Sequence, residues 1–145
     1  MKLSIGCDHG GFEAKEAVKA YLIGKGYEVI DCGTFSTDSC DYPVFAAAAS
    51  RMVAEGQVEK GILICSSGEG VCIVANKIKG VRCGIGYNDE VSHLLVEHNH
   101  ANMISFGAKF MDVDDIKRRV DIFLDAKPLD GRHLRRVEII DSLDK

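Results

Sequence analysis

The chain has 145 residues, of which 46% are hydrophobic and 28% charged, with six cysteines and a formal net charge of −4 at pH 7. This length suits one domain, residues 1–145, whose core needs no disulfide staples, and the acidic balance offers no overall basic field for nucleic acid. No apolar run approaches the roughly 20 residues that cross a bilayer or forms a signal peptide, so we expect a cytoplasmic protein that has no membrane partner and binds small molecules or other proteins.

Short β-rich runs alternate with helical patterns from end to end. The patterns predict strands at 2–7, 27–32, 60–65, 81–86 and 103–106, and helices at 11–25, 43–56, 69–78, 88–98, 112–125 and 132–143. Five successive β-α units predict an α/β fold with a five-stranded parallel sheet and helices on both faces. Ligands of such sheets bind beyond the carboxyl ends of the strands, so we expect the site among the loops at 7–11, 32–43, 65–70 and 87–89 and the turn at Gly107.

The first of these loops, G-C-D-H-G-G, sets the Asp8 carboxylate beside the His9 imidazole where the first strand ends. Both side chains can face the mouth of a pocket, although Asp8 is equally suited to cap the helix that follows. The loop does not match the dinucleotide fingerprint G-x-G-x-x-G, because Asp8 stands where a glycine belongs, and no Walker-type phosphate loop occurs in the chain. These absences disfavour NAD and nucleoside triphosphates as ligands.

Cys65 ends the predicted strand at 60–65 and enters the small-residue turn S-S-G-E-G, from which a helix starts. The dipole and free N–H groups of a helix N-terminus stabilise a thiolate and a nearby anion, and small residues let main-chain N–H groups converge on one oxygen. Cys65 is therefore the leading candidate for the reactive group; the alternative is a core thiol in a tight loop. Val71 stands where a cysteine-dependent phosphatase needs arginine, which disfavours that chemistry.

The predicted helix at 88–98 carries an apolar stripe that ends in His98. Val91, Leu94 and Leu95 precede it at helical spacing, so we expect His98 to face inward or into a subunit contact. The helix C-terminus favours the protonated imidazole, which a general acid needs, and the alternative is an ordinary core histidine. The histidines and cysteines show no ligand pairs at metal-binding spacing, so we expect no metal site.

Arg132 and Arg136 lie one turn apart on the same face of the last predicted helix, where like charges repel. Neither has an acidic residue three or four positions away, whereas Arg135 has Glu138. Two guanidinium groups at this spacing suit a phosphate, which accepts several charge-assisted hydrogen bonds. The alternative is that both arginines are simply solvated.

These motifs together resemble one family, the sugar-phosphate isomerases of ribose-5-phosphate isomerase type B and the related galactose-6-phosphate isomerase subunits. The resemblance spans nearly the whole chain. It rests on G-C-D-H-G-G at 6–11, D-Y-P at 41–43, G-I-L-I-C at 61–65, A-N-K at 75–77, E-H-N-x-A-N at 97–102, F-G-A-K at 106–109 and G-R-H-x-x-R-V at 131–137. The resemblance implies a metal-free, cofactor-free aldose-ketose isomerase with a Rossmann-like three-layer α/β/α fold.

The resemblance also implies roles for particular residues. Cys65 looks like the base that takes the proton from carbon 2 of the open-chain sugar, and His98 looks like the acid that assists ring opening. Asp8 and Ser67 would help to move hydroxyl protons. The remaining substrate contacts it implies are the main-chain N–H groups of Ser66, Ser67, Gly68, Glu69 and Gly70 for the enediolate oxygen, Asn99 for the sugar, and His9, Lys109, Arg132 and Arg136 for the phosphate.

The family further implies a homodimer or a dimer of dimers with shared active sites, in which the helix at 132–143 packs on a partner subunit. We expect the conversion of ribose 5-phosphate to ribulose 5-phosphate in the pentose phosphate pathway. This chain departs from the family in having Ser66-Ser67 where Gly-Thr is usual, Glu69 in the anion loop, and Lys109 where arginine is usual. The alternatives are a galactose or allose 6-phosphate isomerase, an accessory subunit of one, and a nucleotide-binding module.

Overall fold

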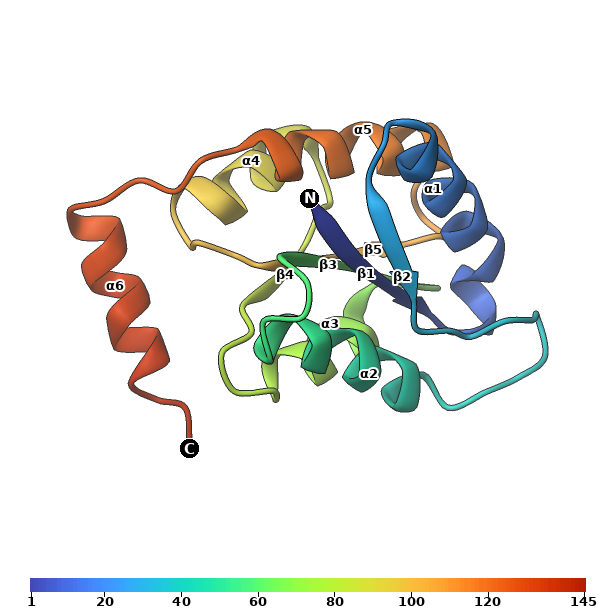
Figure 1. Ribbon diagram of the computed structural model, residues 1–145, viewed down its shortest axis with the longest axis horizontal. Coiled ribbons are helices and arrows are strands. Elements are labelled where there is room, and N and C mark those ends of the chain that lie inside the picture. The colour runs from blue at the N-terminus through green and yellow to red at the C-terminus, as the bar shows by residue number, and fades with distance from the viewer.

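The structure, a computed structural model, describes residues 1–145 as a doubly wound α/β domain (Figure 1). Its five strands form one parallel sheet in the order β2-β1-β3-β5-β4. The strands are β1 (Lys2–Cys7), β2 (Glu28–Asp31), β3 (Lys60–Cys65), β4 (Cys83–Ile85) and β5 (Met103–Gly107); the helices are α1 (Phe12–Gly24), α2 (Tyr42–Ala54), α3 (Glu69–Asn76), α4 (Asp89–Glu97), α5 (Val113–Asp125) and α6 (Arg132–Asp141), with a 3-10 turn at His9–Gly11. The predicted fold class and every predicted element are confirmed.

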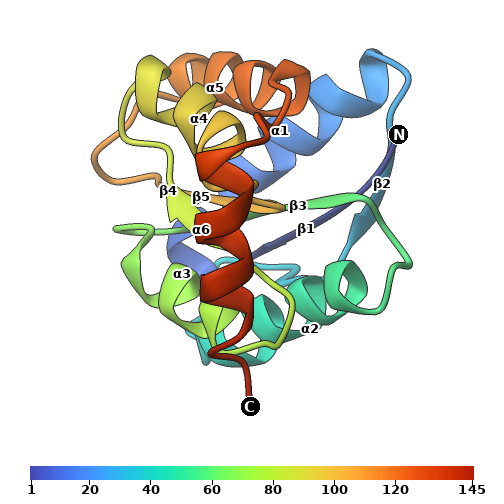
Figure 2. The same cartoon turned by 90° about the vertical axis from the view of Figure 1, so that its left-hand side faces the viewer.

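The sheet lies between two helical layers, with α1, α4 and α5 on one face and α2 and α3 on the other (Figure 2). The central strands β1, β3 and β5 are buried on both faces, as their nearly continuous apolar sequences require. Ile62, Ile64 and Phe106 face the α1 side, whereas Leu63 and Cys65 face the α2 side. None of the helices combines the length and apolar character that a bilayer crossing requires.

The largest boundary difference is at the edge strand β4, which covers Cys83–Ile85 where the sequence predicts 81–86. Val81 is held in a turn instead, since its N–H donates to the carbonyl of Ile78 at 3.1 Å. The preceding helix α3 ends at Asn76, two residues early, and the Asn76 side chain then bonds both main-chain groups of Cys83. A side-chain clamp of this kind is not visible in hydrophobic periodicity.

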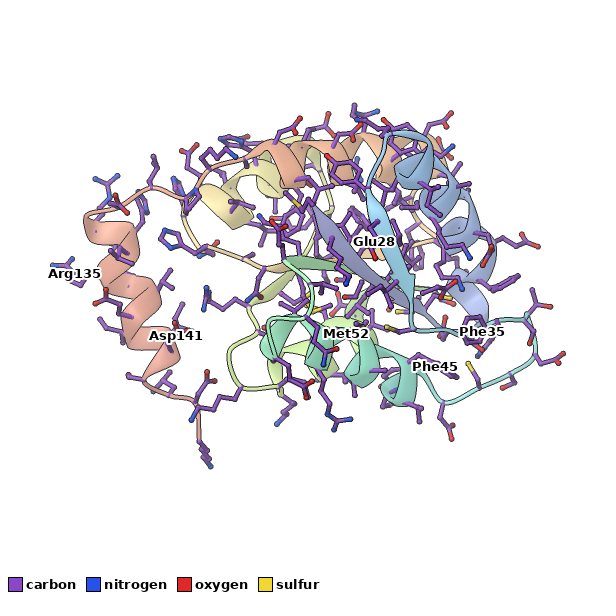
Figure 3. All side chains as sticks on the ribbon, in the orientation of Figure 1. Glu28, Phe35, Phe45, Met52, Arg135 and Asp141 are labelled. Carbon is purple, nitrogen blue, oxygen red and sulfur yellow. The ribbon has the colours of Figure 1, made fainter.

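Helix α6 stands apart from the three layers and crosses their edge beside β4 (Figure 2). It contacts the rest of the domain at both ends: near its start the ring of His133 stacks on that of His98, and near its end Asp141 pairs with Arg82 at 2.7 Å and Asp144 accepts from the Gly80 N–H at 2.9 Å. Asp141 points back to the body, whereas Arg135 points away from it (Figure 3). Several apolar side chains of this segment remain exposed: Leu134, Ile139, Ile140 and Leu143. One chain therefore buries Val137 of this helix but leaves these other apolar side chains exposed.

Candidate active site

The thiol of Cys65 lies at the carboxyl end of β3, directly before the first turn of α3. Its sulfur accepts a hydrogen bond from the main-chain N–H of Gly68 at 3.1 Å. Gly68 has a φ of 83°, and a Cβ there would lie 2.8 Å from the main-chain carbon of Phe106, so only glycine fits this turn. The sulfur thus lies between a main-chain donor and the N-terminal end of a helix.

The turn after Cys65 presents three main-chain N–H groups with no acceptor in the chain, those of Ser66, Ser67 and Gly70. The sequence-based expectation of five donors is therefore wrong for two of them. The Gly68 N–H is committed to the Cys65 sulfur, and the Glu69 N–H donates to Ser67 Oγ at 3.1 Å. The side chain of Glu69 is exposed, so its carboxylate is solvated. Three unpaired donors in one turn still suit a developing oxyanion.

Asp8 and His9 lie next to this turn, because β1 is the neighbour of β3 in the sheet. The Asp8 N–H donates to the carbonyl of Ile64 at 3.3 Å, and its carboxylate caps the 3-10 turn by accepting from the Gly11 N–H at 3.1 Å. Asp8 is 7% exposed. The capping alternative thus describes one carboxylate oxygen of Asp8.

The exposed imidazole of His9 is oriented by the loop between β2 and α2. Its Nδ1 accepts from the main-chain N–H of Cys40 at 3.2 Å, so the ring proton of the neutral form is on Nε2. The Cys40 thiol lies 3.8 Å from the same nitrogen. This arrangement leaves Nε2–H of His9 as a donor for a ligand at the loop surface.

Ser66 and Lys109 complete the loop cluster around the thiol. The Ser66 hydroxyl occupies the space beside Gly10, where a Cβ would approach it to 2.2 Å. The carbonyl of Ser66 accepts from the Lys109 N–H at 3.1 Å, which joins the β5 loop to the thiol turn. The Lys109 ammonium lies 5.8 Å from the ring centre of Phe110, on an exposed surface. Asp8, His9, Lys109 and the thiol turn therefore share the carboxyl edge of the sheet.

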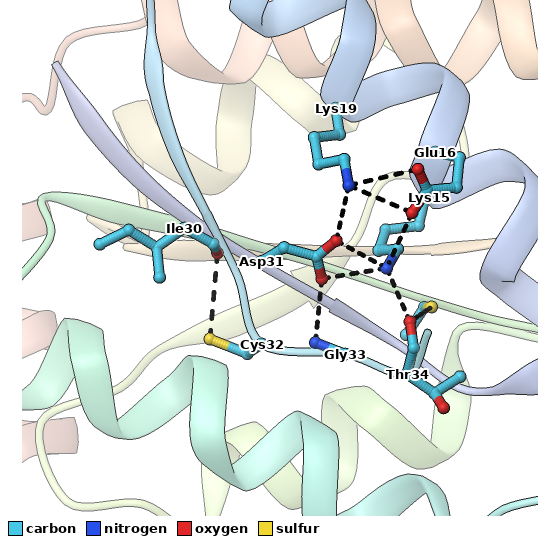
Figure 4. A network of polar contacts seen from close by, with 9 residues as sticks. Lys15, Glu16, Lys19, Ile30, Asp31, Cys32, Gly33 and Thr34 are labelled. Carbon is cyan, nitrogen blue, oxygen red and sulfur yellow. Dashed lines mark hydrogen bonds and ion pairs between the residues drawn. The ribbon is translucent and has the colours of Figure 1, made fainter. Parts of the chain in front are cut away.

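A buried lysine anchors the loop that carries Cys40 (Figure 4). Lys15 is fully buried, and its ammonium bonds both oxygens of Asp31, at 3.0 and 2.8 Å, and the carbonyl of Thr34 at 2.7 Å. Burial alone would raise the pKa of Asp31, but hydrogen bonds from Lys15 and Lys19 hold it below its usual value. A buried charge is tolerated only when it is paired in this way.

Four of the predicted site residues lie near the amino ends of the strands, away from the Cys65 turn at their carboxyl ends: His98, Asn99, Arg132 and Arg136. Helix α4 runs antiparallel to the strands, so it ends at the amino edge, where β5 begins. The register pairs Met103 with Gly61 and Gly107 with Cys65. Four residues of strand, at about 3.3 Å each, separate the two edges by about 13 Å. One chain therefore does not bring His98 and Cys65 together.

The inward orientation predicted for His98 is wrong. The buried face of α4 is formed by Ser92 and Val96, and the His98 side chain is 41% exposed at the helix end. Its ring stacks on that of His133, with ring centres 4.2 Å apart and an angle of 4° between the planes. Desolvation and the neighbouring charges of His98 and the α6 arginines lower the pKa of His133. A contact of His98 with a second subunit remains a prediction.

Arg132 and Arg136 are exposed on α6 and form no ion pair in the chain, in contrast to Arg82, Arg118 and Arg119. The possible Arg135–Glu138 pair does not form either. Two unneutralised guanidinium groups one helical turn apart thus remain available for an external anion.

The isolated chain encloses no cavity lined by Cys65, whose residue is 5% exposed. The largest hollow, about 350 Å³, is lined by neighbours of the loop cluster such as Gly10, Ala14, Ala108 and Met111. The sequence predicts a pocket at the thiol, and none of the hollows of the single chain is lined by Cys65. Ser66 and Ser67, the two residues that follow Cys65, are exposed, so the thiol lies just beneath an open surface.

Sequence reasoning missed three residues that shape this site. His133 lies between Arg132 and Arg136 in the sequence, and Cys40 directly precedes the D-Y-P motif. Tyr42 covers Gly70, where a Cβ would lie 2.7 Å from the tyrosine ring. His133 and Tyr42 each lie in a motif that the sequence analysis had noted, G-R-H-x-x-R and D-Y-P, whereas the contact of Cys40 depends on how the loops cross.

The fold and the loop cluster define a doubly wound α/β protein that presents a thiol, a carboxylate and unpaired main-chain donors at the carboxyl edge of its sheet. The sequence model of the family described as Ribose/Galactose Isomerase matches residues 3–140. Ribose-5-phosphate isomerase B of Escherichia coli (strain K12) is 40% identical over 144 residues, which cover 99% of this chain and 97% of that protein.

Two solved structures are similar over nearly their whole length. Ribose-5-phosphate isomerase B of Clostridium thermocellum has a TM-score of 0.97 at 38% identity and covers 99% of this chain and 97% of that one. Ribose-5-phosphate isomerase B from Mycoplasma genitalium with bound ribulose-5-phosphate has a TM-score of 0.93 at 33% identity, covering 97% and 94%. The chain belongs to the ribose/galactose isomerase family.

Proposed function

We propose that this protein is an aldose-ketose isomerase that interconverts ribose 5-phosphate and ribulose 5-phosphate, with Cys65 as the base. The observation that carries the proposal is the Cys65 sulfur at a turn whose free N–H groups suit an oxyanion. Membership of the ribose/galactose isomerase family and the similarity to a relative with bound ribulose-5-phosphate support the choice of substrate.

The reaction moves one proton between neighbouring carbons of the open-chain sugar. The Cys65 thiolate takes the proton from carbon 2, and the electron pair moves through carbon 1 to the aldehyde oxygen, which gives an enediolate. The N–H groups of Ser66, Ser67 and Gly70 stabilise the charge on that oxygen. The thiol then returns the proton to carbon 1, while Asp8 and Ser67 move the hydroxyl protons of oxygens 1 and 2.

The phosphate and the ring-opening step require residues from both edges of the sheet. His9 and Lys109 lie at the thiol edge, whereas His98, Asn99 and the α6 arginines lie about 13 Å away at the other edge, by the strand rise. We therefore propose a homodimer in which the α4–α6 region of one subunit reaches the thiol edge of its partner. The exposed apolar side chains of α6 support this role for the C-terminal helix.

The proposed reaction needs no metal or cofactor, since a thiolate base and preorganised donors supply both the proton transfer and the charge stabilisation. We place it in the cytoplasm. The six cysteines of this chain, all free thiols, suit that reducing compartment.

The direct test follows turnover of ribose 5-phosphate by the purified protein in deuterium oxide, with a chelator present. We expect ribulose 5-phosphate that carries deuterium at carbon 1, and loss of this product in Cys65→Ala. Galactose 6-phosphate and allose 6-phosphate, offered in parallel, distinguish the hexose alternatives. Normal turnover by Cys65→Ala would refute the base assignment.

The shared site is tested by mixing two inactive variants, Cys65→Ala and His98→Asn. If each site takes one residue from each subunit, half of the statistically formed dimers contain one intact site, so about a quarter of the wild-type activity returns. If both residues act within one chain, no intact site forms and no activity returns. Gel filtration of the same samples reports whether the dimer is present.

A further inference from the structure

Two cysteines outside the proposed site contact each other across neighbouring elements, Cys72 on α3 and Cys83 on β4. The Cys72 sulfur lies 3.5 Å from the carbonyl oxygen of Cys83, and the Asn76 side chain contacts both residues. Both residues are half-buried, and Cys83 lines a cavity of about 290 Å³. The two cysteines are therefore direct neighbours, and Cys83 is open to small solutes.

Asn76 holds the two cysteines in this arrangement. Its Nδ2 donates to the carbonyl of Cys83 at 2.8 Å and lies 3.6 Å from the Cys72 sulfur, while its Oδ1 accepts from the Cys83 N–H at 2.9 Å. One side chain thus contacts the main chain of one cysteine and the sulfur of the other. This clamp keeps α3 and β4 in register, which limits the movement needed to join the sulfurs.

The surroundings of the two thiols shift their pKa values in opposite directions. Hydrogen bonds from Cys83, Ser105 and Asn76 lower the pKa of Cys72 to about 7, against the effect of its burial. The pKa of Cys83 is raised by its hydrogen bond to Cys72 and by burial. Cys72 is the sulfur that is readily ionised near neutral pH, and Cys83 keeps its proton.

We propose that Cys72 and Cys83 form an oxidisable dithiol that hydrogen peroxide closes to a disulfide, a modification site separate from the catalytic thiol. The Cys72 thiolate attacks one peroxide oxygen; the O–O bond breaks, and a sulfenic acid and hydroxide form. The Cys83 sulfur then attacks the Cys72 sulfur, the S–O bond breaks, and the thiol proton leaves with the departing oxygen as water. Two thiols and one peroxide give one disulfide and two waters, and two electrons pass from sulfur to oxygen.

The pair is connected to the Cys65 turn through α3, whose N-cap is Gly68. Ser105 Oγ donates to the carbonyl of Gly68 at 3.0 Å, and the Gly68 N–H is the donor to the Cys65 sulfur. A disulfide ties the first turn of α3 to β4 and so constrains the N-terminal end of this helix at Gly68. If the proposed isomerase function holds, oxidation therefore also displaces the Gly68 donor and lowers turnover.

The modification is tested without an activity assay, in the full-length Cys65→Ser variant. The protein is treated with hydrogen peroxide, its free thiols are alkylated, and it is digested with trypsin without reduction. We expect the peptides at 61–77 and 83–109 to be joined through Cys72 and Cys83. In Cys83→Ser we expect a Cys72 sulfenic acid that dimedone traps. Alkylation of both thiols under conditions that oxidise other cysteines would overturn the proposal.

The link to the site is tested separately by activity. We expect the peroxide-treated wild type to lose roughly 10²-fold in turnover, the cost of one preorganised donor, and to recover with dithiothreitol. Cys72→Ser, treated alongside, keeps its turnover. Equal losses in both proteins would show that peroxide acts on Cys65 directly and would overturn the link. A protein inactive on every sugar phosphate refutes the proposed function and leaves the peptide result valid.

Discussion

Gly68→Ala is the substitution for which the structure allows the most detailed prediction. Gly68 adopts a φ of 83°, which costs an alanine about 1–2 kcal/mol. The added Cβ would also lie 2.8 Å from the carbon and 3.1 Å from the oxygen of Phe106, and 3.0 Å from the Gly107 nitrogen. These are main-chain atoms that cannot rotate away, so relief of the overlap adds about 1–3 kcal/mol.

The overlap forces the turn outward, and the Gly68 N–H moves with it. Its hydrogen bond to the Cys65 sulfur, 3.1 Å long, then stretches, and the free N–H groups of the same turn lose their convergence. Loss of one preorganised donor costs roughly 3 kcal/mol, or about 10² in turnover. We therefore expect a destabilisation of about 2–5 kcal/mol, the sum of the two steric terms, and a hundredfold lower kcat.

Gly56→Ala is the matched control, because Gly56 has a φ of 73° and no atom within 4 Å of the added Cβ. It should show only the backbone cost of about 1–2 kcal/mol and normal turnover. The measurements are chemical denaturation for stability and initial rates of ribulose 5-phosphate formation for kcat. If Gly68→Ala retains kcat within a factor of two while Gly56→Ala behaves as expected, the role of the Gly68 donor is refuted.

Three further outcomes follow from buried and exposed charges. Lys15→Met should cost about 3–5 kcal/mol in urea unfolding, because it leaves the carboxylate of Asp31 without its buried partner; an unchanged midpoint would contradict this. The pKa of Asp31 is lower in the folded than in the unfolded state, so its contribution to stability is complete above the unfolded value of about 3.9 and is lost as pH falls. The stability difference between wild type and Asp31→Asn should therefore shrink below about pH 4, and a constant difference across acid titration would refute the pairing. Arg132→Ala and Arg136→Ala should each raise KM for the sugar phosphate roughly tenfold, the range of a charge-assisted hydrogen bond, whereas Arg135→Ala, which points away in Figure 3, should not.

The thiol turn illustrates how far the local sequence reaches. Strand β3 and helix α3 are both read from periodicity, and the small residues between them predict a turn with free N–H groups. The local sequence does not predict which of these N–H groups stay free and which form hydrogen bonds within the turn. Gly68 and Glu69 direct their N–H groups to Cys65 and Ser67, because the left-handed Gly68 folds the turn back on itself against Phe106. Packing against β5, forty residues later in the chain, sets that conformation.

His98 is a residue whose orientation the local sequence predicts wrongly. Its helical spacing from Leu94 and Leu95 predicts an apolar face, but the helix is rotated so that Ser92 and Val96 are buried. The last turn of α4 then projects beyond the sheet, where α6 brings His133 against the ring. Hydrophobic periodicity identifies an amphipathic helix, and it does not report which neighbour lies at its end.

The amino-acid sequence by itself determined the parallel α/β fold and the carboxyl-edge position of Cys65, Asp8 and His9, because alternating strand and helix patterns allow few other arrangements. Tertiary structure alone decided that His98 and the α6 arginines lie at the far edge, and that Cys72, Asn76 and Cys83 meet. The physical reason is that periodicity depends on neighbours along the chain, whereas these contacts depend on the order of strands across the sheet and on how helices of different units pack.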